Sequence, residues 1–119
     1  MNGFYRIAAA TPCLSLGDPS ANAKTLARLA KDAAKDGVSA IVFPELCLTG
    51  YTCGDLFFRT DPLSAAESAL ADFAAATAKL PIIVLVGFPQ RDGDLIRNAA
   101  AVVHGGAIAG VVCKRILPT

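Results

Sequence analysis

The sequence lacks any apolar run long enough to cross a membrane and any surplus of charge of one sign. Its longest apolar stretch, residues 80–88, is far shorter than the roughly 20 residues that a spanning helix needs, so we expect it to be a buried strand. The net charge is +1 over 119 residues, with Lys and Arg dispersed along the chain. Neither nucleic acid nor an anionic membrane is therefore an expected partner.

Paired cysteines, metal-ligand spacings and glycine loops for phosphates are missing as well. The four cysteines, Cys13, Cys47, Cys53 and Cys113, form no CxxC pair, and with the single histidine, His104, they match no zinc spacing. No basic segment with an apolar core and a small-residue cleavage site follows the first residue. We expect a cytoplasmic protein with reduced thiols, and no cofactor bound by these residues.

What the chain does have is apolar content. Hydrophobic residues make up 54% of it and the mean hydropathy is +0.50, which is high for a soluble unit of this length. The length suits one small domain with a moderate core. Either that core is covered on both faces, or much of the apolar surface belongs against protein outside this sequence.

The first part of the chain predicts a strand, a helix and a second strand. Residues 6–14 are mostly apolar and indicate a strand. Asp18-Pro19 is a helix-opening pair, since Asp can cap and Pro suits the first turn, and Gly37 is placed to end the helix. Residues 38–43 then read as a strand, so we expect a parallel pair with a right-handed crossover. The helix would bury one stripe, formed by Ala23, Leu26, Ala27, Ala30 and Ala34.

The second part repeats this signal and then changes to a hairpin. Asp61-Pro62 opens a second predicted helix that Pro81 ends. Residues 81–87 predict the clearest buried strand, which Phe88-Pro89 would close. A turn at 91–94 precedes two strands, 95–103 and 107–113, joined at Gly105-Gly106. The predicted fold class is α/β, a mixed sheet with helices on one face.

Glu45 is the first candidate for chemistry. Pro44 ends the strand before it, so Glu45 should lie at the strand's carboxyl end, which is where ligands bind in open α/β sheets. Neighbouring Phe43, Leu46 and Leu48 would partly desolvate the carboxylate and raise its pKa toward the range of a general base. The alternative is an ordinary glutamate in a surface loop.

Lys114 is the second candidate, because it directly follows the last predicted strand. Amide hydrolysis through a tetrahedral intermediate needs a nucleophile, a base and a cation or donors for the oxyanion. Glu45 and Lys114 could supply the base and the cation, although a solvated surface lysine is the simpler reading. Cys47 and Cys53 read as loop or core thiols, and Cys113 as a packing residue.

Three stretches resemble the nitrilase, or carbon-nitrogen hydrolase, superfamily. They are the motif Phe-Pro-Glu-Leu-Cys-Leu-Thr-Gly-Tyr at residues 43–51, Gly-Asp-Leu-Phe-Phe-Arg at 54–59, and the hairpin with its Lys at 98–119. Asp18-Pro19 with Asn22-Ala23 falls before them in the expected order. The Leu-Thr-Gly-Tyr and Asp-Leu pattern is similar, more narrowly, to the amino-terminal glutaminase domain of glutamine-dependent NAD synthetases.

This resemblance implies roles for three residues. Glu45 matches the general base, Lys114 the lysine that stabilises the tetrahedral intermediate, and Tyr51 a residue near the substrate pocket, although its phenol could equally be a packed side chain. The family's nucleophilic cysteine lies on a later strand, and none of the four cysteines matches its context. Residues 1–119 would thus be the first half of a four-layer α/β/β/α glutaminase domain, inactive alone because the cysteine is missing.

The resemblance also implies a substrate and partners. Glutamine would be hydrolysed to glutamate, and the ammonia would amidate deamido-NAD in an ATP-dependent step. ATP and Mg would bind only to a synthetase domain absent from this sequence, and the parent protein would be a homo-oligomer. Two alternatives stay open: another carbon-nitrogen hydrolase, such as an amidase or carbamoylase, and a non-catalytic remnant or assembly module that binds a partner through an exposed sheet.

Overall fold

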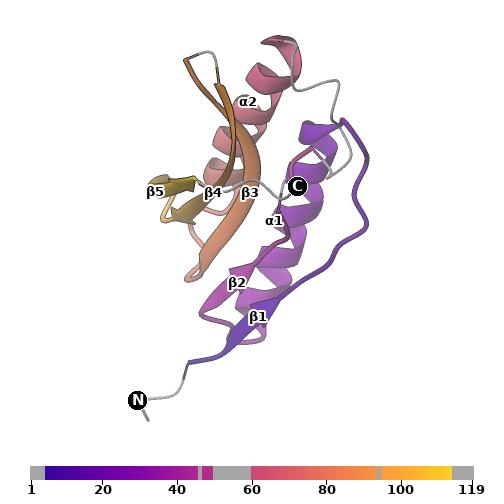
Figure 1. Ribbon diagram of the computed structural model, residues 1–119. Coiled ribbons are helices and arrows are strands. Elements are labelled where there is room, and N and C mark those ends of the chain that lie inside the picture. The colour runs from indigo at the N-terminus through magenta and orange to yellow at the C-terminus, as the bar shows by residue number, and fades with distance from the viewer. Residues whose placement is uncertain (1–4, 46, 50–59, 94, 114–119) are drawn as a thin grey trace.

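A computed structural model describes residues 5–45, 47–49, 60–93 and 95–113 (Figure 1). Within these residues, two helices and five strands follow one another in the order that the sequence predicted. The helices are α1 (Pro19–Lys35) and α2 (Thr60–Ala76); the strands are β1 (Ile7–Ala9), β2 (Ala40–Val42), β3 (Ile83–Asp92), β4 (Leu95–His104) and β5 (Ala107–Cys113).

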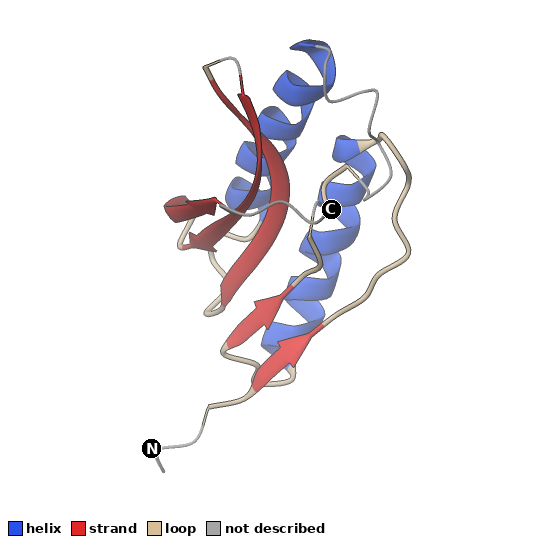
Figure 2. Ribbon diagram, in the orientation of Figure 1, coloured by secondary structure: helices blue, strands red, loops and turns tan. Residues whose placement is uncertain are grey.

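The strands form one mixed sheet in the order β1-β2-β3-β4-β5. β1 pairs with β2, and β2 with β3, in parallel, whereas the β3–β4 and β4–β5 pairs are antiparallel. Both helices lie on the same side of this sheet (Figure 2). The predicted fold class, a mixed α/β sheet with helices on one face, is therefore confirmed. The helices are the crossovers that parallel neighbours require.

Local signals explain where α1 begins and ends. The Asp18 Oδ1 atom accepts a hydrogen bond from the Ala21 backbone N–H at 3.1 Å, and Pro19 occupies the first turn. This satisfies one of the amide groups that a helix start leaves without a partner. The helix ends at Lys35, and Gly37 has a φ of 79°, a left-handed conformation that glycine adopts without steric cost.

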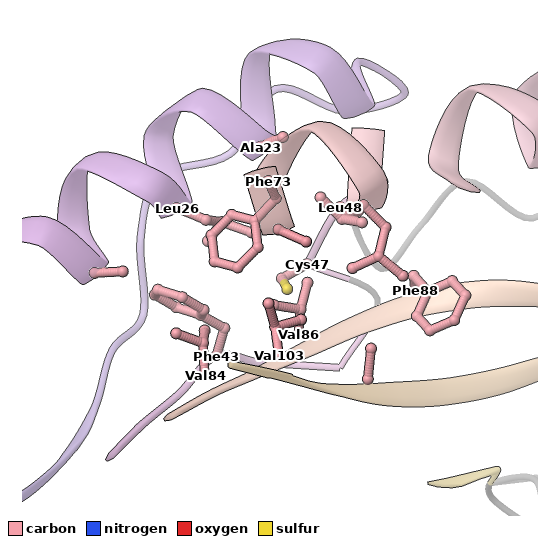
Figure 3. Close-up of a cluster of buried hydrophobic side chains, with 14 of the residues drawn as sticks. Ala23, Leu26, Phe43, Cys47, Leu48, Phe73, Val84, Val86, Phe88 and Val103 are labelled. Carbon is pink, nitrogen blue, oxygen red and sulfur yellow. The ribbon is translucent and has the colours of Figure 1, made fainter. Parts of the chain in front are cut away.

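The hydrophobic core lies between the helices and the sheet (Figure 3). Ile82, directly before β3, and the residues 84, 86 and 88 of that strand are buried, as are residues 99, 101 and 103 of β4. This alternation is the two-residue period of strands. The helices contribute small or medium side chains together with one large one, Phe73, which is 1% exposed. Small side chains let the helices approach the sheet closely.

The opposite face of the sheet carries apolar side chains that are not buried. The pairing register places Ile7, Ala40 and Ile83 side by side on three neighbouring strands. Ile7 is 70% and Ile83 42% exposed, and Val112, further along on β5, is 66% exposed. We call this surface the open face. The described residues thus form one helix layer and one sheet layer, so the four-layer sandwich stays a prediction.

Three boundaries differ from those that the sequence predicted. The first strand covers only Ile7–Ala9 rather than residues 6–14, and α2 begins at Thr60, before the Asp61-Pro62 pair. β3 continues past Phe88-Pro89 to Asp92, so the proline does not close it.

Proline is tolerated within β3 because of the direction in which its nitrogen points. The carbonyls of Leu85 and Gly87 accept hydrogen bonds from the segment that follows β2. In a strand, the backbone N–H and C=O groups of every second residue point to the same neighbouring strand. The nitrogen of Pro89 therefore points in the same direction as the carbonyls of Leu85 and Gly87, away from β4. Among the described residues, the pairing of β2 with β3 ends at Leu85, and Pro89 therefore removes no ladder hydrogen bond.

Candidate active site

Glu45 lies in the turn that follows β2. The strand ends at Val42, and the Phe43 backbone N–H then donates to the Leu85 carbonyl of β3 at 3.1 Å. Pro44 and Glu45 follow as exposed residues. The position predicted for this carboxylate, directly after the carboxyl end of a parallel strand, agrees with the structure.

The turn after Glu45 is fastened to β3 through Gly87. The Leu48 N–H donates to the Gly87 carbonyl at 3.2 Å. The Gly87 N–H donates to the Cys47 Sγ at 3.3 Å, and the Cys47 thiol donates to the Gly87 carbonyl at 3.5 Å. Both polar groups of one β3 residue are thus used to hold this turn. With Phe43 bonded to Leu85, the backbone on either side of Glu45 is fixed to β3.

Asn22 of α1 holds the same turn from the helix side. Its side chain is 1% exposed. It accepts from the Ser15 N–H at 2.7 Å and donates to the carbonyls of Ser15, at 2.8 Å, and Leu48, at 2.9 Å. One buried carboxamide therefore joins the loop before α1 to the turn after Glu45, with its polar atoms satisfied as burial requires.

Asn98 of β4 contacts the Glu45 carboxylate. Its Nδ2 donates to the Glu45 Oε2 at 3.3 Å, across 53 residues of sequence. Asn98 stands opposite Pro89 in the β3–β4 register. The contact joins the turn after β2 to the central hairpin of the sheet.

Glu45 and Asn98 line a hollow of about 340 Å³ at this end of the open face. Among its lining residues, Glu45 is the one titratable side chain and Asn98 the other polar one. The rest are apolar or have no side chain beyond hydrogen: Val42, Phe43, Pro44, Leu85, Gly87, Ala99, Ala100 and Val112. A mostly apolar hollow with few polar groups is typical of small-molecule sites.

The surroundings of Glu45 differ in part from those inferred from its sequence neighbours. Glu45 is exposed. Phe43 is 5% exposed and lines the hollow beside it, whereas Leu48 is 0% exposed, belongs to the core and does not line the hollow. Leu46 lies outside the described residues. The rest of the apolar environment comes partly from Val42 and Pro44, and partly from residues of β3, β4 and β5 that are distant in sequence.

The described cysteines take the roles expected of core or loop thiols. Cys47 is 0% exposed, and burial raises its pKa to about 11, so it is a neutral thiol at pH 7 and lacks the thiolate that a nucleophile needs. Cys113 is half-buried and its thiol donates to the Gln90 Oε1 at 3.3 Å. Cys13 is exposed, and Cys53 lies outside the described residues.

Lys114 and Tyr51 also lie outside the described residues. The strand before Lys114 is described: β5 ends at Cys113, which pairs with Ala99 on β4. Ala99 is the neighbour of Asn98 in the chain. The register therefore brings the last residue of β5 to the strand segment that contacts Glu45.

The described part of the chain contains neither a cluster of metal ligands nor a membrane-spanning helix. There, no three His, Cys, Asp or Glu residues gather closely enough to hold a metal ion. Neither α1 nor α2 combines the length and the apolar character that crossing a membrane requires.

Comparison with known proteins decides the family. The model of the family described as carbon-nitrogen hydrolase matches residues 6–119. The chain belongs to the carbon-nitrogen hydrolase family. This carbon-nitrogen hydrolase chain is 42% identical over 118 residues to the glutamine-dependent NAD(+) synthetase of Mycobacterium tuberculosis H37Rv; the match covers 99% of the chain and 17% of that protein.

Solved structures agree with this assignment. A glutamine-dependent NAD(+) synthetase from Cytophaga hutchinsonii superposes with a TM-score of 0.88 at 29% identity, over 96% of this chain and 19% of that one. An amidase from Nesterenkonia sp. has a TM-score of 0.80 at 22% identity, over 97% of this chain and 44% of that one, which shows a shared fold. The carbon-nitrogen hydrolase chain thus spans about a sixth of the curated relative quoted above.

Asn22 and Asn98 were missed as site residues, although both left a signal. Asn22 stands four residues before Leu26 and eight before Ala30, which places a polar side chain on the helix stripe that must be buried. Asn98 interrupts a largely apolar strand. A buried polar residue needs partners, but the sequence does not say which ones.

Proposed function

We propose that residues 1–119 carry the general base and the oxyanion-stabilising lysine of a glutaminase site like that of glutamine-dependent NAD synthetases. The observation that carries this proposal is the Glu45 carboxylate at the end of β2, contacted by Asn98 within a mostly apolar hollow. Membership of the carbon-nitrogen hydrolase family and the names of the relatives quoted above support the substrate class. The site would act in the cytoplasm.

Glu45 would act as the base and then as the acid in the hydrolysis of glutamine's side-chain amide. It takes the proton of a cysteine thiol as the sulfur attacks the carbonyl carbon, and it returns that proton to the leaving nitrogen as the C–N bond breaks. Ammonia leaves and a thioester remains. Glu45 then accepts a proton from water as the water's oxygen attacks the thioester carbon, and it returns that proton to the sulfur as the C–S bond breaks, which releases glutamate and regenerates both the thiol and the Glu45 carboxylate.

Lys114 and Tyr51 are the other residues of this sequence to which we assign roles in the proposed site. Lys114 follows Cys113 in the sequence, and Cys113 pairs with the neighbour of Asn98. Its ammonium group would stabilise the negative oxygen of the tetrahedral intermediate, which is the term that usually contributes most to such reactions. Tyr51 would line the pocket that receives glutamine.

The nucleophilic cysteine would come from polypeptide outside residues 1–119. The buried, neutral Cys47 does not suit the role, and Cys113 packs against Gln90. The 119 residues alone should thus release no ammonia from glutamine. The intact mass of the native polypeptide, compared with the 12.2 kDa of this sequence, tests this directly, because a matching mass would leave the site without its nucleophile.

ATP and Mg would serve the later amidation of deamido-NAD, and they would bind outside residues 1–119.

Matched variants of the native polypeptide test the roles of Glu45 and Lys114. We expect E45Q to abolish ammonia release from glutamine, whereas E67Q, which removes a carboxylate from an exposed position of α2, should leave it unchanged. K114M should likewise reduce the rate far more than K79M, which replaces an exposed lysine that follows α2. Faster turnover of simple aliphatic amides or carbamoyl compounds than of glutamine would favour another carbon-nitrogen hydrolase activity.

The open face favours a second candidate, a non-catalytic assembly module. Ile7, Ile83 and Val112 expose between 42% and 70% of their surface there, and contiguous exposed apolar surface is typical of interaction sites. If assembly were the sole function, the E45Q/K114M double variant would keep the native partners and the cellular phenotype of the wild type. Loss of the phenotype with partners retained would support catalysis instead.

A further inference from the structure

We infer that Asn98 is a positioning residue for Glu45. Its side chain holds one oxygen of the Glu45 carboxylate and thereby orients the carboxylate toward the reacting atoms. This inference rests on the proposed function of Glu45 as the base. It adds a residue from β4 to the site that the family resemblance assigns to Glu45, Tyr51 and Lys114.

The direction of the hydrogen bond follows from the chemistry of the two groups. An ionised carboxylate only accepts, so the NH2 end of the Asn98 side chain must be the end that faces the Glu45 Oε2. A carboxamide is neutral and not basic, so it cannot take the proton that Glu45 handles. It can therefore orient the base without competing for the proton and without adding charge to the hollow.

The donor is held on a rigid element, whereas Glu45 lies in a turn. β4 is flanked by β3 and β5, and the residue after Asn98, Ala99, is 2% exposed and paired on both sides. The backbone on either side of Glu45 is bonded to β3, through Phe43 and Leu48. The contact from Asn98 adds a constraint on the side chain, and sites supported in this way keep the geometry that catalysis needs.

A position on the same strand provides a matched control. Val102 lies four residues from Asn98, so its side chain is on the same face of β4, it is half-buried, and it does not line the hollow. V102A therefore measures the effect of shortening a β4 side chain on this face without touching Glu45. N98D keeps the size and shape of the Asn98 side chain but removes its hydrogen-bond donor. A loss of activity in N98D would therefore come from the lost donor and not from a change in packing.

The experiment compares N98A, N98D and V102A in the native polypeptide at its natural length. We expect N98A and N98D to lower kcat for glutamine hydrolysis by about tenfold or more, with KM within twofold of wild type, and V102A to retain wild-type kcat. Carbon-13 NMR of the Glu45 carboxyl carbon should show its pKa higher in N98A, because the ionised form loses a donor, and higher still in N98D, because two carboxylates repel.

The two readouts distinguish the inference from the proposal beneath it. An unchanged Glu45 titration in N98A, wild-type kcat in N98D, or an equal loss in V102A would each overturn the role of Asn98. Full activity in E45Q would instead overturn the proposed function, while the NMR titration would still decide whether Asn98 donates to Glu45.

Discussion

Replacing Asn22 by alanine should destabilise the protein more than any exposed substitution on α1. The side chain makes three hydrogen bonds, of 2.7, 2.8 and 2.9 Å, to Ser15 and Leu48. A buried hydrogen bond contributes about 1 kcal/mol net, and the groups left behind are buried without partners, so N22A should lower the free energy of unfolding by about 3 kcal/mol. This corresponds to a fall in Tm of about 12 °C for a domain of this size.

The assay is urea denaturation followed by circular dichroism, with K24A, at an exposed position of the same helix, as the control that should stay within about 0.5 kcal/mol of wild type. N22D keeps the shape but directs a carboxylate at two carbonyl oxygens. Its pKa in the folded state is therefore raised above the unfolded value, and stability should recover as the pH is lowered through that pKa. An N22A protein as stable as K24A would refute the view that this carboxamide holds the turn after Glu45.

Further predictions concern a thiol, a helix cap and a turn. Burial raises the pKa of Cys47 from 9.0 to about 11, so the unfolded state loses the thiol proton at a lower pH than the folded state does. The free energy of unfolding should therefore fall as the pH rises from 9 to about 11. This fall should be smaller in C47A, which lacks the buried thiol, than in the control C13A. In the native state, iodoacetamide should modify Cys13 and spare Cys47, and equal rates would contradict the burial. D18A should cost about 1 kcal/mol in urea denaturation whereas D18N should not, since Asn caps equally well. G106A should also lower Tm, because φ is +86° and an added Cβ would lie 3.0 Å from the Ala78 Cβ; a wild-type Tm would show that the turn relaxes.

The parts of the fold that sequence predicted well are those set by local signals. The start of α1 at Asp18-Pro19 and the turn at Gly105-Gly106 depend on residues next to each other, and both appear in the structure. The end of β3 was predicted wrongly at Phe88-Pro89, because whether a proline ends a strand depends on which side its nitrogen faces. That side is fixed by pairing with segments far away in the chain.

The residues of the candidate site also differ in whether the local sequence is enough to find them. Glu45 could be found from a strand-ending proline and a family motif, both within a few residues. Asn98 and Asn22 could not, because their contacts to the turn after β2 span 53 and 26 residues and depend on the sheet register and on helix packing. The apolar surroundings of Glu45 divide likewise: the adjacent Phe43 lines the hollow as expected and Leu48 does not, while the contributions of β3, β4 and β5 depend on the sheet register.

Because the turn after β2 is hydrogen-bonded to Gly87 of β3, this turn can take its final conformation only after β3 has been synthesised. Gly87 leaves the ribosome 42 residues after Glu45, and Asn98 leaves 53 residues after it. A nascent chain that ends before β3 contains the motif around Glu45 but not Leu85, Gly87 and Asn98, whose hydrogen bonds hold that motif in place. Closing such long loops costs entropy before any contact forms. The Glu45 carboxylate is thus synthesised well before the residues that hold it, and it takes the geometry described above only after Asn98 has been added.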